Sequence, residues 1–348
     1  MQGFQFTAMT DSFPYPLLTR KQLTEQINQL AALRTPFLFI VDYKAENGYV
    51  IKKNDLDERY IQFQFESQHS QSLIQNTEHK TRNVEHRMCS WDIKPVSLDD
   101  YKQKFEFVQQ QIHFGNSFLV NLTQPTSVQT NFSLLEIYRQ SRAKYKIWIK
   151  DSLLTLSPET FIKIEGQTIS SFPMKGTIDA TIPNAKEILR NDPKELAEHA
   201  TILDLIRNDM SRIADHVSVK RYRYVEKIKT NKQDLYQVSS KITGRLDHDY
   251  RENLGDILFE LLPAGSISGA PKAKTLEIIQ EAEGYERGFY SGICGWFDGD
   301  NVDSGVMIRF IEQKGEELIY KSGGGVTAQS ELIKEYEELI QKVYVPVC

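Results

Sequence analysis

The sequence has few of the features that mark a membrane, secreted or nucleic-acid-binding protein. Its longest apolar run, Pro36–Val41, is far too short to span a bilayer. Only three cysteines, Cys89, Cys294 and Cys348, occur in 348 residues, and their wide spacing suggests neither a disulfide framework nor a metal motif. The net charge of −5 offers no basic footprint for nucleic acid or an anionic membrane.

The opening residues also lack the basic segment and apolar segment of a secretory signal. Together with the cysteine usage, this predicts a reducing compartment and a cytoplasmic protein. Hydrophobic residues make up 40% of the chain, enough for a sizeable core. No repeat, low-complexity tract or linker divides the sequence, so we predict one domain over residues 1–348.

Apolar periodicity divides the chain into helices and strands, and their order predicts the fold class. Strand-like runs joined by short turns, with helices between the groups, favour an α+β fold with antiparallel sheets over a doubly wound fold. We expect the polar stretch Glu66–Arg87 to be an exposed loop. Helices are predicted at residues 21–34, 97–115, 133–145, 193–214, 251–262, 272–284 and 331–342, and strands at 37–43, 60–65, 118–123, 146–149, 153–156, 161–165, 168–172, 217–229 and 234–246.

One lysine lies in a short irregular segment, Pro173–Thr177, directly after a predicted strand. Proline and glycine restrict the backbone there and allow close approach of a ligand. A lysine amine that is partly removed from water becomes a usable nucleophile, which makes Lys175 a candidate catalytic residue. Taken alone, the segment is more typical of a solvated loop lysine.

The predicted helix 193–214 carries two carboxylates on its apolar side. Asp192 is a good N-cap, and Glu195 has the spacing of a capping box. At 100° per residue, Glu195 and Glu198 nevertheless fall on the stripe that faces the core. A buried carboxylate needs a partner, so Glu198 indicates a functional site, whereas Glu195 is equally explained by the cap.

The last predicted helix repeats this pattern. Glu335, Glu338 and Lys342 share one sector at the edge of its apolar stripe. One interpretation is a surface ion pair between Glu338 and Lys342. The other is that both glutamate-bearing helices meet and hold Mg²⁺, which prefers oxygen ligands and often binds through one or two carboxylates plus substrate oxygens.

Two glycine-rich segments, Pro263–Lys272 and Ser322–Val326, are predicted to be turns. Their backbone amides can hold a carboxylate or phosphate, although such segments are more often simply tight turns. Neither matches a nucleotide-binding motif. Arg309 lies in a predicted apolar strand, where it could bind a carboxylate bidentately or form a structural ion pair. Cys294 is interpreted as a small buried residue.

Taken together, these residues resemble one family, the chorismate-utilising enzymes, and within it the aminodeoxychorismate synthases. The resemblance covers about residues 95–345, and residues 1–94 are a divergent part of the same fold. It implies an α+β fold with two large antiparallel sheets sandwiched between helices. The matching stretches are Val120–Thr123, Ser157–Phe161, Pro173–Thr177, Glu195–His199, Asp204–Asp209, Ser266–Lys272, Arg287–Gly292, Ile308–Arg309, Gly323–Val326 and Glu335–Lys342.

The resemblance also implies roles for these residues. Chorismate would bind beside Mg²⁺, with Glu198 and Glu338 as direct ligands of the metal. Glu195 and Glu335 would support them, through water or by orientation. The implied substrate-binding residues are Gly176, Thr177, Ser268, Gly269, Tyr290, Arg309, Gly323, Gly324, Gly325 and Lys342.

Lys175 decides the branch of the family, because relatives that make anthranilate resemble P-I-A-G-T at this position. By resemblance, Lys175 would attack ring C2 of chorismate and expel the C4 hydroxyl, with Glu159 as general acid and base. Ammonia would then displace the lysine at C4. Isochorismate synthases need a lysine where we align Leu119, and many relatives have a histidine where this chain has Gln237.

The expected product is therefore 4-amino-4-deoxychorismate, a precursor of 4-aminobenzoate and folate. No glutaminase region is found, so ammonia would come from a separate glutamine amidotransferase subunit or from solution. No tryptophan-site motif is found either, so feedback inhibition by tryptophan is not expected. The alternatives are an anthranilate synthase component I and an inactive chorismate-binding regulatory subunit. Lys175 argues against the first, and the retained Lys175, Glu159 and four glutamates argue against the second.

Overall fold

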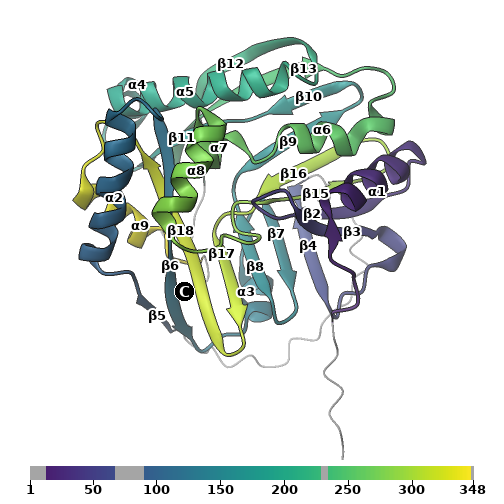
Figure 1. The fold of residues 1–348 in the computed structure, drawn as a ribbon, viewed down its shortest axis with the longest axis horizontal. Coiled ribbons are helices and arrows are strands. Elements are labelled where there is room, and N and C mark those ends of the chain that lie inside the picture. The colour runs from purple at the N-terminus through teal and green to yellow at the C-terminus, as the bar shows by residue number, and fades with distance from the viewer. Residues whose placement is uncertain (1–12, 67–89, 229–233, 346–348) are drawn as a thin grey trace, which may run out of the picture.

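Two antiparallel β-sheets form the centre of the molecule, and helices cover their outer faces (Figure 1). The computed structural model of the chain describes residues 13–66, 90–228 and 234–345. In these ranges the larger sheet has ten strands and the smaller has eight. This arrangement confirms the predicted α+β class.

The larger sheet brings together segments from both ends of the chain. The N-terminal strand β2 pairs with β15, and β15 pairs with β16, so residues near 40 lie beside residues near 295. In spatial order, the sheet contains β1 (Leu18–Thr19), β3 (Asn47–Lys52), β2 (Phe37–Val41), β15 (Ile293–Phe297), β16 (Val302–Val306), β9 (Thr160–Glu165), β10 (Thr168–Ser171), β13 (Leu235–Arg245) and β11 (Met174–Asp179), and β12 (Asp215–Ile228) also pairs with β13.

The smaller sheet is built around one long pairing, between β6 and β18. Its strands in spatial order are β14 (Gly269–Ala270), β6 (Leu119–Thr130), β18 (Glu317–Val326), β17 (Phe310–Lys314), β8 (Leu153–Ser157), β7 (Tyr145–Ile149) and β4 (Ile61–Phe65), and β5 (Trp91–Lys94) also pairs with β6.

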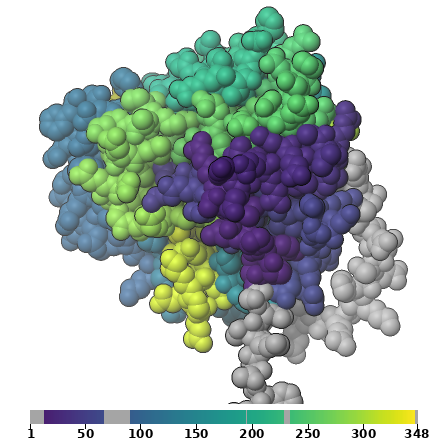
Figure 2. All heavy atoms as spheres, turned by 45° about the vertical axis from the view of Figure 1, so that its right-hand side comes forward, coloured from purple at the N-terminus to yellow at the C-terminus, as the bar shows by residue number. Residues whose placement is uncertain are grey.

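The helices are α1 (Arg20–Ala32), α2 (Leu98–His113), α3 (Leu134–Gln140), α4 (Ala185–Asn191), α5 (Pro193–Met210), α6 (Leu254–Glu260), α7 (Gly265–Ser268), α8 (Lys272–Glu283) and α9 (Leu332–Gln341), with 3₁₀ turns at Lys53–Asp55 and Tyr250–Asn253. In the space-filling view, the purple N-terminal segment and the green segment above it form one continuous surface (Figure 2). Asn28 of α1 holds α6 there, donating to Asp256 at 2.6 Å and accepting from the Gly255 N–H at 2.6 Å.

Apolar side chains fill the space between the two sheets. Leu38 and Ile40 of β2 are fully buried, as is Ile147 of β7 on the facing sheet. Each such side chain contributes roughly 1.5–3 kcal/mol by leaving water. The unbroken apolar run Phe37–Val41 is buried at every position, which is typical of a strand covered on both faces. No helix in the described ranges is long and apolar enough to cross a membrane.

Most predicted elements are present, with differences that have local causes. The helix expected at 133–145 ends at Gln140, because the fully buried strand β7 begins at Tyr145. The helix expected at 193–214 ends at Met210. Helix α4 was not predicted, and most of the loop expected at Glu66–Arg87 lies outside the described residues.

Both glycine-rich turns were predicted wrongly. Pro263–Lys272 contains helix α7 and the short strand β14. Ser322–Val326 is the end of β18, and it pairs in continuous register with β6 from Ser322↔Gln124 to Val326↔Val120. Glycine is uncommon inside strands, so the sequence pattern favoured a turn.

Candidate active site

Lys175 lies on β11, an edge strand of the larger sheet, and not in a loop as predicted. The ladder between β11 and β13 shifts register between Lys175 and Thr177, and Gly176 has φ +71°. This bulge is a conformation that glycine adopts without strain. A Cβ at Gly176 would lie 2.9 Å from Glu195 Oε2, so the glycine also lets that carboxylate of α5 approach the strand.

The Lys175 amine forms an ion pair with the predicted metal ligand Glu198. Lys175 Nζ lies 3.4 Å from Glu198 Oε2, and the two side chains are 19% and 7% exposed. Glu198 is thus buried, as its place on the apolar stripe predicted. Both groups face β18, because a Cβ at Gly325 would lie 3.3 Å from Lys175 Nζ and 3.7 Å from Glu198 Oε2.

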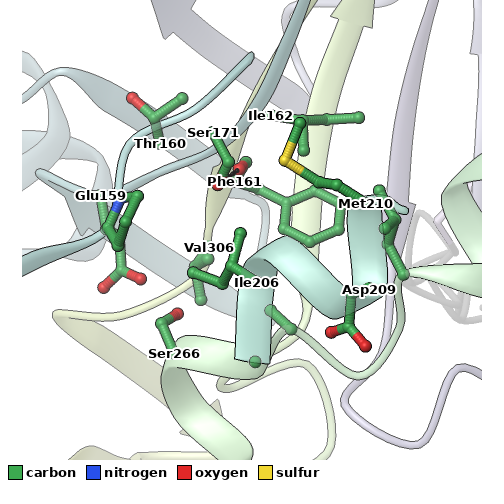
Figure 3. A pocket seen from close by; sticks show the side chains of 14 residues that line it. Glu159, Thr160, Phe161, Ile162, Ser171, Ile206, Asp209, Met210, Ser266 and Val306 are labelled. Atoms are coloured by element: carbon green, nitrogen blue, oxygen red, sulfur yellow. Dashed lines mark hydrogen bonds between the residues drawn. The ribbon is translucent and has the colours of Figure 1, made fainter. Parts of the chain in front are cut away.

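Glu159 lies between β8 and β9, where its carboxyl faces helix α7 and Ser266 (Figure 3). Burial raises the pKa of Glu159, while a hydrogen bond from Ser266 and the charges of Lys175 and Lys342 oppose that shift. A raised pKa keeps a carboxyl protonated closer to neutral pH, as a general acid requires. The adjoining cavity has a volume of ≈ 30 Å³, which matches about one water molecule.

Lys342 and Arg309 add two further positive charges to this region. Lys342 Nζ donates to the Gly323 carbonyl at 2.8 Å and to Glu338 Oε1 at 2.5 Å. Burial lowers the pKa of Lys342, Glu338 opposes the shift, and Arg309 and Lys175 reinforce it. These couplings place both Lys175 and Arg309 within electrostatic reach of Lys342, and an anionic ligand would relieve the repulsion at Lys342.

Arg309 is not in a strand, contrary to the sequence prediction. It lies in the bend between β16 and β17 with φ +52°, a conformation that is strained for arginine. Its guanidinium group lies 5.1 Å from the centroid of Tyr344 and donates to the Lys342 carbonyl at 3.4 Å. Backbone strain of this kind is common where a side chain is positioned for a ligand.

Glu335 and Glu338 of α9 converge on the neighbouring glycine of β18. A Cβ at Gly324 would lie 3.2 Å from Glu338 Oε1 and 3.3 Å from Glu335 Oε2. Glu198 of α5 and the Glu335–Glu338 pair of α9 therefore approach β18 at adjacent residues, whereas Glu195 approaches Gly176 of β11. In the part of the chain that the structure describes, no group of three or more His, Cys, Asp or Glu is arranged to hold a metal ion.

The carboxylates nevertheless fit a magnesium site in chemistry. All four donors are oxygens, and Mg²⁺ commonly binds through one or two carboxylates, with water and substrate oxygens supplying the rest. Glycines at 324 and 325 leave the carboxylates room beside the strand that a larger residue would fill. Glu198 and Glu338 would hold the ion, and Glu195 and Glu335 would support it.

The remaining predicted substrate-binding residues differ in their surroundings. Tyr290 is buried, which raises its pKa to about 12, and Arg309 is among the charges that oppose this shift. Thr177 is exposed. Ser268 is buried and donates to the Ala264 carbonyl at 3.1 Å, and Gly269 packs against the Leu119 carbonyl. Cys294 is buried, as predicted, and burial raises the pKa of its thiol.

Three residues near the site were not identified from the sequence. Ser266 bonds Glu159 from a segment that was interpreted as a turn. Burial, together with Arg223 and Lys175, lowers the pKa of His199 to about 4, and its Nε2 lies 2.7 Å from Ser240 Oγ. Arg223 donates to the Leu189 and Arg190 carbonyls and so caps α4. A histidine beside Glu198 was visible in the sequence, whereas Arg223 lies in a basic strand without any distinguishing signal.

The fold is that of chorismate-converting enzymes of known structure. Anthranilate synthase component I from Streptococcus pneumoniae superposes with a TM-score of 0.72 at 21% identity, covering 98% of this chain and 94% of that one. The putative isochorismate synthase DhbC from Bacillus anthracis gives 0.69 at 16% identity, covering 94% and 89%. At these identities the likeness concerns the fold alone.

The chain belongs to the chorismate binding enzyme family, whose model matches residues 3–347. An uncharacterized PabA-like protein of Haemophilus influenzae is 43% identical over 94% of this chain and 98% of its own length. Aminodeoxychorismate synthase component 1 of Klebsiella aerogenes is 33% identical over 71% of this chain and 57% of that longer protein. Anthranilate synthase component 1 of Acetivibrio thermocellus is also 33% identical, over 71% and 52%.

Proposed function

We propose that this chain is an aminodeoxychorismate synthase component I, which aminates chorismate at C4 with ammonia in the synthesis of 4-aminobenzoate and folate. The observation that carries the proposal is the placement of Lys175, whose amine lies 3.4 Å from Glu198 and within electrostatic reach of Glu159. An anthranilate synthase would have no use for a nucleophile here. The similarity to a Klebsiella aerogenes enzyme of the proposed name supports this choice.

The proposed reaction proceeds in two displacements without net oxidation or reduction. The neutral Lys175 amine forms a bond to ring C2, and the C4–oxygen bond breaks as the two conjugated ring double bonds shift. Glu159 gives its proton to the departing hydroxyl, which leaves as water. Ammonia then forms the C4–nitrogen bond, the bond between Lys175 and C2 breaks, and a proton returns to the enzyme.

The anionic groups of chorismate require cations and donors around the ring. Arg309 and Lys342 would bind its carboxylates, and Gly323, Gly324 and Gly325 would let the substrate lie close to β18. Mg²⁺ bound near Glu198 and Glu338 would supply positive charge for a substrate carboxylate. Ammonia would come from a separate glutamine amidotransferase subunit, or from ammonium in solution.

The test is product analysis after incubation with chorismate, Mg²⁺ and an ammonium salt. We expect 4-amino-4-deoxychorismate, which chromatography separates from anthranilate. Without ammonia, an adduct of the ring should accumulate on Lys175 and be located by peptide mass mapping. Lys175→Ala should abolish both results, while Lys274→Ala, which changes a half-exposed lysine of α8, should leave both unchanged.

Other outcomes would identify the alternatives. Anthranilate as the main wild-type product would support an anthranilate synthase and contradict the proposal. Chorismate binding without turnover at any ammonium concentration would indicate a regulatory subunit. Production of 4-amino-4-deoxychorismate by Lys175→Ala at the wild-type rate would exclude covalent catalysis by this lysine.

A further inference from the structure

A second cavity lies next to the strand that carries Lys175. Its volume is ≈ 240 Å³, the share of roughly eight water molecules in the liquid. The walls come from β9, β11, β12 and β13 of the larger sheet, whose positions are seen in Figure 1, together with Lys144 and Glu66 from the smaller sheet's side. Thr160 and Met174 line it, and these are the chain neighbours of Glu159 and Lys175.

The cavity is positively charged. Its lining includes four basic side chains, Lys144, Lys163, Arg221 and Lys241, against the two acidic side chains Glu66 and Glu226. Glu66 is already engaged, because its Oε2 lies 3.3 Å from Lys144 Nζ and 2.9 Å from Lys163 Nζ. Glu226 is exposed and forms no ion pair with a described residue, so the basic residues of the lining without a carboxylate partner are Arg221 and Lys241.

Arg221 and Lys241 face each other across neighbouring strands. They are partners in the ladder between β12 and β13, whose register shifts on both sides of Arg221, and like charges at paired positions destabilise a sheet. Lys163, another basic residue of the cavity, instead has a carboxylate on the paired strand that balances its charge. It is the ladder partner of Asp303, and its Nζ lies 3.7 Å from that carboxylate. Neither Arg221 nor Lys241 forms an ion pair with any residue that the structure describes.

Aromatic rings hold these two cations in place. The Arg221 guanidinium lies 3.8 Å from the centroid of Tyr224, and Lys241 Nζ lies 5.5 Å from that of Phe172. Lys144 Nζ is 6.0 Å from the same Phe172 ring. Such contacts order a cation without neutralising it. The cavity thus presents two cations without an ion pair, the exposed Arg221 and the half-buried Lys241, beside the apolar surface of Phe172 and Met174.

We propose that this cavity is a second ligand site, which binds a small organic dianion. Its two negative charges bridge Arg221 and Lys241, and its organic part contacts Phe172 and Met174. A phosphate monoester and a dicarboxylate share this chemistry. Because Met174 directly precedes Lys175, an occupant touches the strand that positions the proposed nucleophile. The binding proposal itself does not depend on the proposed reaction.

Calorimetric titration of the full chain at low ionic strength tests the proposal, because screening is then weakest. Phenyl phosphate and benzene-1,3-dicarboxylate represent the two sources of a dianion, and inorganic phosphate represents a dianion without an organic part. We expect at least one aromatic dianion to bind in a saturable manner, and inorganic phosphate to bind at least tenfold more weakly. Equal binding of inorganic phosphate would contradict the proposal that the ligand is organic. Absence of binding by both aromatic dianions would contradict the proposal of a binding site.

Variants locate the binding. Arg221→Gln combined with Lys241→Gln should weaken it at least tenfold, while Lys220→Gln, an exposed lysine next to Arg221 that does not line the cavity, should not change it. Unchanged binding by the double variant would refute the proposal. Binding that is lost instead in Arg309→Gln would locate the ligand at the proposed chorismate site and equally refute it.

Unfolding in anion-free buffer provides a second measurement. Lys241→Gln removes a like-charge repulsion together with the cation–π contact to Phe172, so the urea midpoint should change little. Lys163→Gln breaks the pairing with Asp303 and Glu66, so its midpoint should fall. A fall for Lys241→Gln as large as that for Lys163→Gln would mean that Lys241 has an anionic partner besides its contact with Phe172, and the argument for an anion would fail.

Discussion

Gly325→Ala tests whether Lys175 and Glu198 form the reacting geometry. The new methyl group would lie 3.3 Å from Lys175 Nζ, 3.7 Å from Glu198 Oε2 and 2.9 Å from Leu119 Cδ1. The lysine and leucine side-chain ends must move by a few tenths of an ångström or more, because the first and last of these contacts are tight. Overpacking of this kind costs about 1–3 kcal/mol of stability. Misplacement of a reacting group by about 1 Å can lower a rate by about 10²-fold.

We therefore expect Gly325→Ala to lose up to about 10²-fold in kcat for chorismate consumption, with a modest fall in the urea midpoint. Gly244→Ala is the matched control, since its methyl group would lie 2.8 Å from the Ala214 Cβ, away from Lys175. It should lose similar stability and keep its turnover per folded molecule. Wild-type kcat in Gly325→Ala would show that the lysine does not act from this position, and equal losses of kcat in both variants would show only a general packing effect.

Three further predictions concern the glutamates. Glu198→Gln and Glu338→Gln should each raise the Mg²⁺ concentration needed for half-maximal turnover, whereas full wild-type turnover in excess chelator would exclude a required metal. Burial raises the pKa of Glu159, so its contribution to stability is present below the unfolded pKa of about 4.3 and is lost as pH rises through the folded value. Glu159→Gln should therefore unfold at a higher urea concentration than wild type at pH 8, and the difference should be smaller at pH 4. Its turnover should fall about 10²–10⁴-fold. An equal difference in urea midpoint at both pH values would contradict the account of stability. Glu283→Gln should lower the free energy of unfolding by about 3–5 kcal/mol, because it leaves the buried Arg287 charge without its partner at 2.6 Å, and a loss below 1 kcal/mol would contradict that account.

Sequence periodicity identified most of the fold because long, regular elements carry a strong signal. The apolar stripe of α5 and its N-cap Asp192 predicted the bounds of that helix to within a few residues. In the structure, Asp192 accepts a hydrogen bond from the Glu195 N–H at 2.9 Å. The positions of Lys175 and Arg309 were harder to predict. A bulge at Gly176 and a left-handed conformation at Arg309 depend on pairing with distant strands, and local sequence does not determine such pairing.

The residue types of the site were likewise easier to predict than their arrangement. Glu198 was identified because a carboxylate on an apolar stripe is unusual, and the structure buries it. Its pairing with Lys175 could not be predicted, since 23 positions of sequence and a strand-to-helix connection separate the two residues. Ser266 was missed because helix α7 is a single turn, too short to produce a periodic signal.

The glycines of β18 have a different structural role from the one that their sequence motif predicts. In a turn, Gly323, Gly324 and Gly325 would all act through their N–H groups, but here alternate residues of the stretch bond to β6, and β17 pairs with β18 only as far as Lys321. What glycine provides is the absence of side chains, which lets α9 approach at Gly324 and lets Lys175 and Glu198 approach at Gly325. Two adjacent glycines thus admit carboxylates from two different helices at neighbouring positions of the strand. The three glycines thus differ from a turn in the space that they leave, and the alanine variant at Gly325 measures how much of the proposed chemistry depends on that space.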